Sequence, residues 1–361
     1  MMDKLLFYIN GINGGGAARV IIQLARHFAK EGYKSILVTS FVDYNNEYEI
    51  PDNITRLSIE QEQIIQSKIK RNLSRIKKLR DICKKEKPDA IISFMAEPNF
   101  RALIATTGLK TKRIISVRND PNQEYSGRLG RIIGKLLLPQ ADGCVFQTEE
   151  AKAWFPKKLQ EKSQVIANDV KEEFFNINRE DSVDIVAVGR LEKQKNHKLL
   201  INAFSKIANK YPNQKLRLYG DGTLEEDLLL LIRNLNLQGQ IEIMGATSHV
   251  SEVLKKAKMF VLSSDFEGMP NCLMEALAAG VPCISTDCPC GGPRMLIRDK
   301  RNGLLVPVSD ENALSDAMET LIRNPEYAEA LGQNAKEEAL QFHPDRIFAQ
   351  WKAYIEEVIR K

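Results

Sequence analysis

Residues 267–280 read EGMPNCLMEALAAG, and this stretch decides how the second half of the chain is interpreted. Pro270 stands near its start and Gly280 at its end, the order found where a short helix begins and stops, with the proline at the first helical position. Apolar runs at 259–263 and 282–285 flank the stretch. It therefore predicts a helix between two buried parallel strands. The N-terminus of that helix faces the carboxyl edge of the sheet, where ligands bind in open α/β folds.

Two glutamates accompany this helix, Glu267 on the preceding loop and Glu275 about one turn inside it. The amides at Met269, Asn271 and Cys272, together with the helix dipole, suit an anion such as a phosphate. Carboxylates do not bind phosphate, but they accept hydrogen bonds from vicinal hydroxyl groups. We expect the pair to bind a ribose and a sugar beside a phosphate site. The alternative is a solvated pair on a surface helix.

Other turns in the same half follow predicted strands. Residues 188–196 read VGRLEKQKN, so the cations Arg190 and Lys195 come shortly after Gly189. Arginine holds phosphate oxygens bidentately and lysine supplies a mobile point charge. A solvated basic turn is the alternative here. Small residues at further strand ends would let the backbone approach a base or ribose: Gly220, Gly222 and Gly245.

Outward from this site, short apolar runs alternate with helical segments along the chain, which is typical of parallel α/β units. We expect two successive doubly wound sheets, with the join in the turn-rich residues 166–170. One domain then covers residues 1–167 and the second covers 168–344, while the amphipathic stretch 345–361 packs back on the first. The predicted strands are 5–10, 35–40, 90–93, 113–117 and 143–147, then 184–188, 216–219, 241–244, 259–263, 282–285 and 304–306.

Length and composition agree with two domains, since 361 residues exceed one average core. The first ten residues are predicted as a buried strand rather than a signal peptide, and no apolar run is long enough to span a bilayer. The six cysteines are too few for a disulfide scaffold, which favours free thiols in a reducing, cytoplasmic compartment. Cys288 and Cys290 lack a second pair at ligand spacing, so zinc is a minor alternative.

Charge is distributed unevenly along the chain. Lys and Arg exceed Asp and Glu by ten over residues 1–165 and fall short by five over 166–361. Residues 68–87 hold ten basic and two acidic side chains, and residues 127–138 mix cations with a broad apolar side. The first segment suits a solvated helix or an anionic surface. The second suits a membrane interface or a core helix with exposed cations. No reader motif for nucleic acid accompanies these basic segments, so we expect no nucleic-acid partner.

The first half offers its own turn and loops. Gly15 and Gly16 belong to a Gly-rich strand-to-helix turn that suits phosphate or a tight structural turn, but Arg19 occupies the third glycine position of the dinucleotide fingerprint. Two later loops follow predicted strands and should line a cleft. Their candidate acceptor or sugar contacts are Glu97, Asn99, Arg118 and Asn119.

Taken together, these motifs resemble the retaining glycosyltransferases of family 4. The paired glutamates, the Gly189-Arg190-Leu191 turn with Lys195, and the Gly220-Asp221-Gly222 turn match that family in the same order, as does the later 285–293 stretch. Two positions depart from it: Ala18 replaces a usual acidic residue, and Met295 stands where relatives often carry Glu. The first half resembles bacterial enzymes that extend polyprenyl-diphosphate-linked glycans, including N-acetylgalactosaminyl transferases.

The resemblance implies the GT-B fold, with two Rossmann-like domains facing across a cleft. It implies transfer, with retention, of a hexose or N-acetylhexosamine from a nucleotide sugar, with UDP favoured over GDP, to a lipid-linked or oligosaccharide acceptor. By the same resemblance Arg190 and Lys195 bind the diphosphate, and Glu275 binds the ribose. Gly15 and Gly16 approach the donor or acceptor. The donor sugar is held by Glu267 with the backbone of Gly268, Met269, Pro270 and Asn271.

Many transferases hold a divalent ion with an Asp-x-Asp pair, which this sequence lacks. Because Arg190, Lys195 and helix-end amides can stabilise the leaving diphosphate, we expect no metal and no other cofactor. The basic first domain is expected to dock on anionic lipid, which places the enzyme at the inner face of the cell membrane. Two alternatives remain open, a nucleotide-sugar epimerase of similar shape and a catalytically inert subunit of a glycan-assembly complex.

Overall fold

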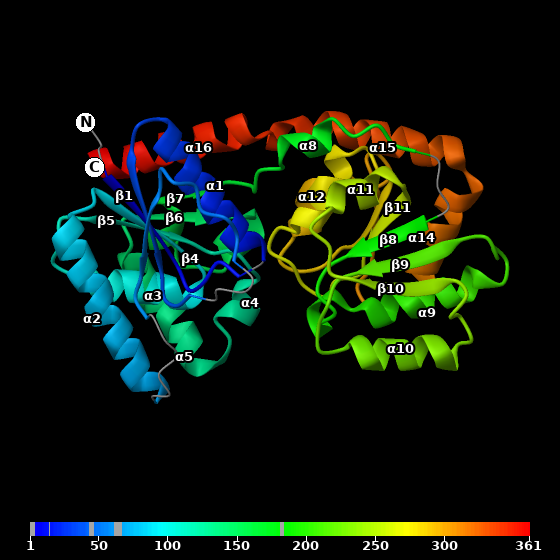
Figure 1. Ribbon diagram of the computed structural model, residues 1–361, viewed down its shortest axis with the longest axis horizontal. Coiled ribbons are helices and arrows are strands. Elements are labelled where there is room, and N and C mark those ends of the chain that lie inside the picture. The colour runs from blue at the N-terminus through cyan, green and yellow to red at the C-terminus, as the bar shows by residue number, and fades with distance from the viewer. Residues whose placement is uncertain (1–3, 14, 43–46, 61–66, 181–183) are drawn as a thin grey trace. The chain divides into compact units, whose positions relative to one another are not determined.

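The computed structural model describes residues 4–13, 15–42, 47–60, 67–180 and 184–361 (Figure 1). The chain divides into two compact units. Unit 1 comprises residues 1–168 together with 345–361, and unit 2 comprises residues 169–344. Each unit is built around one parallel β-sheet with helices packed against it.

Unit 1 contains a seven-stranded sheet of order β3-β2-β1-β4-β5-β6-β7, in which every pairing is parallel. Leu5, Leu6, Phe7 and Tyr8 on the interior strand β1 are fully buried, as expected where helices cover both faces of a parallel sheet. The strand order reverses between β1 and β4, so the carboxyl ends of these two strands form the switch point of the unit. The strands are β1 (Lys4–Ile9), β2 (Lys34–Thr39), β3 (Thr55–Ser58), β4 (Ala90–Phe94), β5 (Lys112–Ser116), β6 (Gly143–Phe146) and β7 (Ser163–Val165).

The C-terminal helix α16 (Pro344–Arg360) packs on unit 1, beside α1 in Figure 1. Its Phe348 stacks on His27 with ring centres 4.3 Å apart, and Trp351 stacks on Phe94. The Tyr354 hydroxyl accepts a hydrogen bond from the Cys144 amide at 2.7 Å. The other helical segments of the unit are α1 (Gly16–Lys30), α2 (Lys68–Glu86), α3 (Ala96–Ala105), α4 (Pro121–Glu124), α5 (Gly127–Ile132), η1 (Ile133–Leu137), η2 (Leu138–Gln140), α6 (Glu149–Ala153) and α7 (Lys157–Gln160).

Unit 2 contains a six-stranded parallel sheet of order β10-β9-β8-β11-β12-β13. Here the order reverses between β8 and β11, which makes their carboxyl ends the second switch point. The strands are β8 (Asp184–Val188), β9 (Lys215–Tyr219), β10 (Ile241–Gly245), β11 (Ala257–Leu262), β12 (Cys283–Thr286) and β13 (Leu304–Val306).

The core of unit 2 gathers the inward faces of these strands with α9 (His197–Ala208) and α14 (Glu311–Arg323), and Phe204 at its centre is fully buried. The short helix α12 (Asn271–Ala278) connects β11 to β12, and its residues Leu273, Met274 and Ala276 are also fully buried. The remaining helical segments are α8 (Glu172–Phe175), η3 (Lys193–Lys195), α10 (Glu225–Asn234), α11 (Val250–Lys255), α13 (Gly292–Leu296), α15 (Pro325–Ala339) and η4 (Leu340–Phe342).

The predicted α/β class with two parallel sheets is confirmed, and each predicted strand overlaps an observed one. Two strands were not predicted, β3 and β7, which lie at the two edges of the first sheet. One local prediction is wrong: Pro270 is not the first helical residue. It caps α12 in an extended conformation, with φ −76° and ψ 106°, and the helix begins at Asn271.

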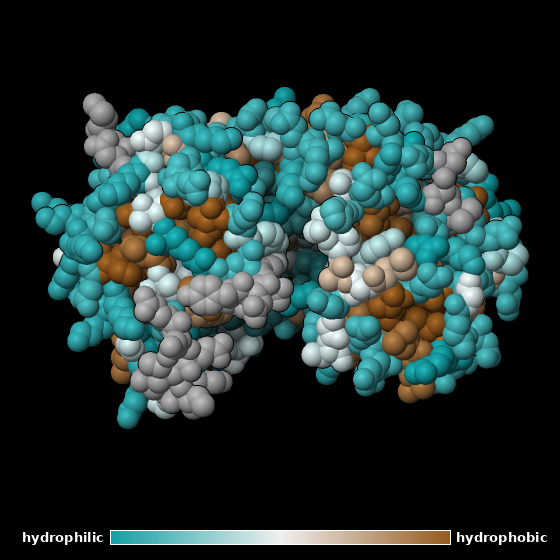
Figure 2. Space-filling view, viewed as in Figure 1, coloured by the Kyte–Doolittle hydropathy of each residue, from teal (hydrophilic) through white to brown (hydrophobic). Residues whose placement is uncertain are grey.

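The surface in Figure 2 is largely hydrophilic, with separate hydrophobic patches that include one over the α10 region of unit 2. Within the described ranges, no helix is both long and apolar enough to cross a membrane. None of the six cysteines forms a disulfide. Among the same residues, no three His, Cys, Asp or Glu side chains gather as a metal site, and Cys288 and Cys290 are buried thiols.

Candidate functional site

An ion pair joins the two loops that leave the switch point of unit 2. Lys195 lies on the turn after β8 and Glu267 on the loop after β11. The Lys195 ammonium donates a hydrogen bond to Glu267 Oε1 at 2.6 Å. Both side chains are nearly buried, with 15% and 8% of their surface exposed. The alternative of Glu267 and Glu275 as a solvated pair is wrong, because the two residues are only 6% and 9% exposed.

Hydrogen bonds between the same two loops fix this pair in place. Asn196 adopts a left-handed conformation, caps α9 through its side chain, and donates to Asp265 Oδ1 at 2.8 Å. Gln194 accepts from the Asp265 amide at 2.9 Å and donates to the Phe266 carbonyl at 3.0 Å. The position of Glu267 is therefore set by the chain on both sides of the sheet's switch point rather than by its own rotamer alone.

The two oxygens of Glu267 are in different situations. Oε1 accepts from both Lys195 and the Ser264 hydroxyl, the latter at 2.7 Å. Oε2 accepts only a long hydrogen bond of 3.4 Å, from Gln194, within the described part of the chain. An oxygen with this spare capacity can accept a hydrogen bond from a hydroxyl group of a bound ligand.

Burial and charge together set the protonation of the residues around this pair. Burial acts to lower the pKa of Lys195, but the charge of Glu267 outweighs it and raises that pKa above its ordinary value. Burial raises the pKa of the Cys272 thiol to about 11. At the start of α9, burial and then the charge of Lys195 lower the pKa of His197 to about 4. At neutral pH the site thus holds a charged lysine, a neutral thiol and a neutral imidazole.

The beginning of α12 lies directly behind Glu267. The Glu267 amide donates to the Pro289 carbonyl at 2.7 Å, and the Cys290 amide donates back to the Glu267 carbonyl at 3.0 Å. Gly292 must be a glycine, because a Cβ there would lie 2.0 Å from the Gly268 carbonyl oxygen. These contacts hold the loop that leads into α12, whose first N–H groups have no acceptor inside the helix. Glu275 follows one turn later in the same helix.

Four predicted donor-site glycines take different positions. Gly189 lies against the Lys195 side chain, whose Cε would be 3.1 Å from an added Cβ. A Cβ at Gly220 or Gly222 would lie within 2.5 Å of the carbonyl oxygen of Gly189 or Leu191, so both allow the turn after β9 to pack on the turn after β8. Gly245, with φ +73°, ends β10 in open space.

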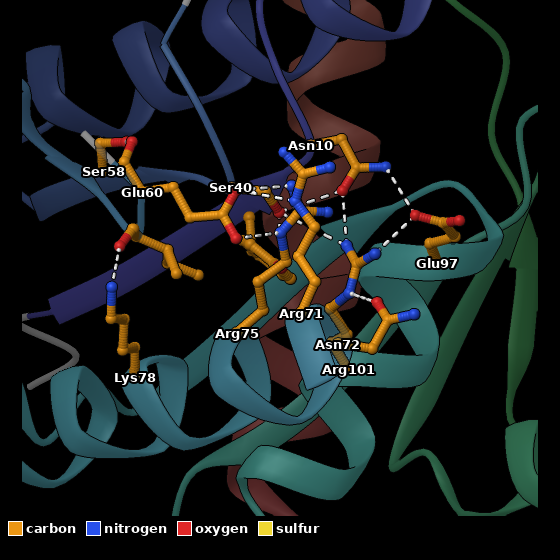
Figure 3. Close-up of polar contacts among 12 residues, drawn as sticks. Asn10, Ser40, Ser58, Glu60, Arg71, Asn72, Arg75, Lys78, Glu97 and Arg101 are labelled. Carbon is orange, nitrogen blue, oxygen red and sulfur yellow. Dashed lines mark hydrogen bonds and ion pairs between the residues drawn. The ribbon is translucent and has the colours of Figure 1, made fainter. Parts of the chain in front are cut away.

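Unit 1 has a corresponding polar network at its own switch point, drawn in Figure 3. Arg101 on α3 is almost fully buried and lies at the centre of this network. Its guanidinium donates to Asn10 after β1 at 2.5 Å, to Glu97 at 2.5 Å and to Asn72 of α2 at 2.9 Å (Figure 3). Nearby, Arg71 and Arg75 donate to Glu60. Sequence analysis missed Arg101, although its spacing of four residues from Glu97 is a recognisable helical ion pair.

Of the four predicted acceptor contacts, Glu97 is the most exposed and Asn119 is partly exposed. The Glu97 side chain is 64% exposed, while Arg101 and Asn10 hold the carboxylate in place. The burial of Glu97 acts to raise its pKa, but the charge and hydrogen bond of Arg101 outweigh this effect and lower it. Glu97 is therefore an ionised and oriented acceptor group at the carboxyl edge of the sheet.

The other three predicted contacts are bonded within the protein. Asn99 is fully buried, accepts from Ser93 and donates to the Ser116 carbonyl at 2.8 Å. Arg118 is buried, donates to Asn168 and lies 4.5 Å from the centre of the Phe94 ring. Asn119 accepts from the next amide in the chain. Asn99, itself in α3, thus ties the helix that carries Glu97 to β4 and β5.

Glu124 is a second residue that sequence analysis did not select. It ends α4, and its Oε1 accepts from the Ala96 amide at 2.7 Å, at the start of the helix that carries Glu97. Its Oε2 has no hydrogen-bond partner among the described residues. Burial raises the pKa of Glu124 to about 7. No sequence signal marks this residue, because its burial comes from residues far away in the chain.

The Gly-rich turn and the basic segments complete the predicted features. Gly15, with φ +85°, precedes the first residue of α1, Gly16, and both are exposed. Several cations of helix α2 are hydrogen-bonded within the protein. Besides Arg71 and Arg75, Arg80 donates to two backbone carbonyls and Lys78 to one. Helix α5 and the η1 segment expose both their cations and several large apolar side chains.

Comparison with known proteins identifies the family. The model of Glycosyltransferase Family 4 matches residues 14–174, and that of Glycosyl transferases group 1 matches residues 169–338. An uncharacterized glycosyltransferase of Methanocaldococcus jannaschii is 30% identical over 80% of this chain and 84% of its own length. The chain belongs to glycosyltransferase family 4. The transferase prediction is confirmed, and with it the enzyme class.

Other relatives of this family 4 glycosyltransferase extend over the whole chain. An α-1,4-N-acetyl-D-galactosaminyltransferase of Campylobacter jejuni, named for an acceptor of two GalNAc residues on diNAcBac-PP-undecaprenol, is 28% identical over 99% of both chains. Among solved structures, sucrose-phosphate synthase of Thermosynechococcus elongatus matches with a TM-score of 0.86 at 18% identity over 99% of both chains. Anabaena HepE in complex with UDP and glucose matches with 0.82 at 16% identity over 98% and 100%. The predicted GT-B fold is thereby confirmed.

Proposed function

We propose that this enzyme transfers a hexose or N-acetylhexosamine, with retention, from a UDP-sugar to a polyprenyl-diphosphate-linked glycan. The observation that carries the proposal is the buried Lys195–Glu267 pair at the switch point of unit 2. This pair provides a fixed cation and a fixed carboxylate at the carboxyl edge of the sheet, where ligands bind, beside the beginning of α12. Cell-surface polysaccharide or glycoconjugate assembly is the process that uses such a reaction.

The diphosphate of the donor is bound by Arg190, Lys195 and the first amides of α12. Cleavage of the sugar–phosphate bond leaves negative charge on the diphosphate, and preorganised cations and N–H groups stabilise that charge in the transition state. Lys195 has three N–H donors, so it can keep its bond to Glu267 while it donates to a phosphate oxygen. These groups supply the electrostatic stabilisation that a divalent ion supplies in other transferases. We therefore propose a reaction that requires no metal.

The two glutamates have separate roles in this proposal. Oε2 of Glu267 accepts from a hydroxyl of the donor sugar, because Oε1 is already occupied by Lys195 and Ser264. Gly268, Met269, Pro270 and Asn271 present their backbone to the same sugar. Glu275 accepts from the ribose hydroxyls of the nucleotide. Gly245 leaves space for the nucleotide, and Gly189 leaves space for the Lys195 side chain beside it.

The acceptor binds unit 1 and is contacted by Glu97, which Arg101 and Asn10 orient. An exposed, ionised carboxylate is suited to accept hydrogen bonds from sugar hydroxyl groups. Asn119 on the following loop is a further contact, and Gly15 and Gly16 approach the donor or acceptor. The Campylobacter relative, named for a GalNAc-bearing undecaprenol diphosphate, supports this choice of acceptor class. A lipid-linked acceptor places the enzyme at the cytoplasmic face of the cell membrane, with its basic unit 1 toward anionic lipid.

A transfer assay tests the proposal. Purified enzyme is incubated with a panel of UDP- and GDP-sugars and a short-chain polyprenyl-diphosphate-linked glycan in excess EDTA, and the anomeric configuration of the product is determined by NMR. We expect transfer from one UDP-sugar with retained configuration. Loss of activity in EDTA with rescue by magnesium would contradict the metal-free mechanism. Epimerisation of a UDP-sugar without an acceptor would contradict transfer.

A further inference from the structure

The helical segment formed by α5, η1 and η2 packs on unit 1 through its glycines. A Cβ at Gly130 would lie 2.6 Å from the carbonyl carbon of Tyr125, and one at Gly134 would lie 2.8 Å from the Trp154 ring. These distances leave no room for a larger side chain. The inward side of the helix is thus fixed by the two glycines and by Leu138, which is fully buried.

The large apolar side chains of this segment point the other way. Leu129, Ile132 and Leu136 are 70%, 51% and 67% exposed, at spacings of three and four residues that place them on one face. A helix that only covered a core would bury such residues and expose small or polar ones. This segment instead buries Gly134 and exposes its large apolar residues, and an exposed apolar stripe of this kind marks an interaction surface.

A row of cations runs beside the stripe. Arg128, Arg131 and Lys135 each precede one of the three apolar residues, and all are exposed. Residues 127–140 contain no acidic side chain. Arg128 and Arg131 form no ion pair within the ranges that the structure describes, and Lys135 lies 5.8 Å from the centre of the Trp154 ring. A shallow hollow of about 550 Å³ lies along both rows.

We propose that Leu129, Ile132 and Leu136 insert into the interface of an anionic lipid bilayer while Arg128, Arg131 and Lys135 contact its phosphate groups. An apolar stripe flanked by cations is the arrangement of helices that lie in a membrane surface. A protein interface fits less well, because such interfaces are enriched in aromatic residues and Met, whereas the exposed apolar residues here are Leu129, Ile132 and Leu136. The inference deepens the proposed function, since it names the surface that holds the enzyme beside its lipid-linked acceptor.

The test is flotation of the full-length enzyme with vesicles that contain no acceptor. We expect binding to vesicles of phosphatidylglycerol and phosphatidylcholine, and at least tenfold weaker binding to phosphatidylcholine alone. Leu129→Ser/Leu136→Ser should weaken binding to the anionic vesicles about tenfold or more. Arg128→Gln should weaken it about fivefold. Leu129→Trp/Leu136→Trp should bind as tightly as the wild type or more tightly, since aromatic residues favour the bilayer interface.

The matched control lies on α10 of unit 2. Leu229 and Leu230 are 40% and 52% exposed, yet their helix begins with three acidic residues. Leu229→Ser/Leu230→Ser removes the same side chains from an acidic helix and should leave vesicle binding unchanged. The thermal midpoint of each variant shows whether it is folded, and the tryptophan variant tests the surface even if the serine variant is not.

Several results would overturn the inference. One is equal vesicle binding by the Leu129→Ser/Leu136→Ser variant and the wild type, and another is an equal loss of binding in the α10 control. A third is a wild-type dimer, detected by size-exclusion chromatography, that the Leu129→Ser/Leu136→Ser substitutions dissociate while vesicle binding is unchanged. The proposed function is tested separately, by transfer to a short-chain acceptor in solution. Transfer without vesicle binding removes this inference alone, whereas vesicle binding without transfer removes the proposed function alone.

Discussion

In both units, polar side chains connect the two strands at the switch point of the sheet, but the two sets of side chains differ in burial. In unit 2, Lys195 after β8 and Glu267 after β11 form a pair that is nearly buried. In unit 1, Asn10 after β1 and Glu97 after β4 are joined through Arg101, but Glu97 stays 64% exposed. Unit 2 thus buries its charged pair, whereas unit 1 presents an oriented carboxylate to solvent.

This difference indicates what each unit does with its ligand. A buried and fixed pair suits a ligand whose charge changes during the reaction, because groups held in place need not reorganise in the transition state. An exposed carboxylate suits the neutral hydroxyls of a sugar, which exchange water for a hydrogen bond. We therefore expect substitutions in unit 2 to affect turnover strongly, and substitutions in unit 1 to affect mainly the acceptor KM.

The largest effect is expected for Lys195→Met. Removal of one partner leaves Glu267 buried without its counter-ion, which costs about 3–5 kcal/mol of the free energy of unfolding. Loss of the cation at the diphosphate should lower kcat about a thousandfold. Lys193→Met is the matched control, since Lys193 lies on the same turn and is exposed. Chemical unfolding and turnover measurements check both effects. Equal stability and equal kcat of the Lys195→Met and Lys193→Met variants would contradict the role of the buried pair in unit 2.

The next effect separates the two glutamates of unit 2. Glu267→Gln should lower kcat about a hundredfold and change UDP affinity only a few-fold, because in the proposed site its Oε2 contacts the donor sugar rather than the nucleotide. Glu275→Gln should weaken UDP binding about tenfold, through one lost hydrogen bond to a charged group. Calorimetry with UDP and a transfer assay measure the two quantities, and the reverse pattern would contradict these roles.

A smaller effect is expected in unit 1. Glu97→Gln should raise the acceptor KM about tenfold while UDP affinity stays unchanged, because one contact to a sugar is weakened. It should also lower the thermal midpoint, because the buried Arg101 loses its carboxylate partner. Glu149→Gln is its control, since Glu149 is also exposed and paired, with Lys152 at 3.9 Å. Steady-state kinetics with varied acceptor give the answer. An unchanged KM would remove Glu97 from the acceptor site.

The last effect concerns stability and its pH dependence at Glu124. The folded protein holds the pKa of this carboxyl at about 7, above its ordinary 4.5. The folded state therefore retains a proton that the unfolded state loses, and wild-type stability falls as pH rises from 4.5 to 7. Glu124→Gln keeps a neutral side chain and should be more stable than the wild type at pH 8 by roughly 3 kcal/mol. The two should match at pH 4.5. Thermal unfolding at both pH values checks this, and a pH-independent difference would contradict it.

Most of the fold was predictable, because buried parallel strands form apolar runs of recognisable length. All six strands of unit 2 were anticipated. The two omissions in unit 1 share a physical cause: β3 and β7 are edge strands with one neighbour each, so their sequences, TRLS and SQV, need little apolar character. The capping role of Pro270 also depends on ψ, which the residue type does not determine.

The candidate sites were predictable to different degrees in the two units. Arg190, Lys195 and the paired glutamates lie in short motifs whose spacing is visible in the sequence. Arg101 depends on partners 29, 61 and 91 residues away, and nothing local shows that an arginine on α3 is buried. Asn99 shows the converse, since a polar residue on a loop looked available but is fully satisfied by Ser93 and Ser116.

The most direct test of the central claim is calorimetric titration of the enzyme with UDP and with UMP in excess EDTA. A diphosphate site built from Arg190, Lys195 and the beginning of α12 predicts micromolar binding of UDP without metal, and binding of UMP weaker by roughly fiftyfold through lost charge-assisted hydrogen bonds. Equal affinities for UDP and UMP, or UDP binding that appears only when magnesium is added, would contradict the account.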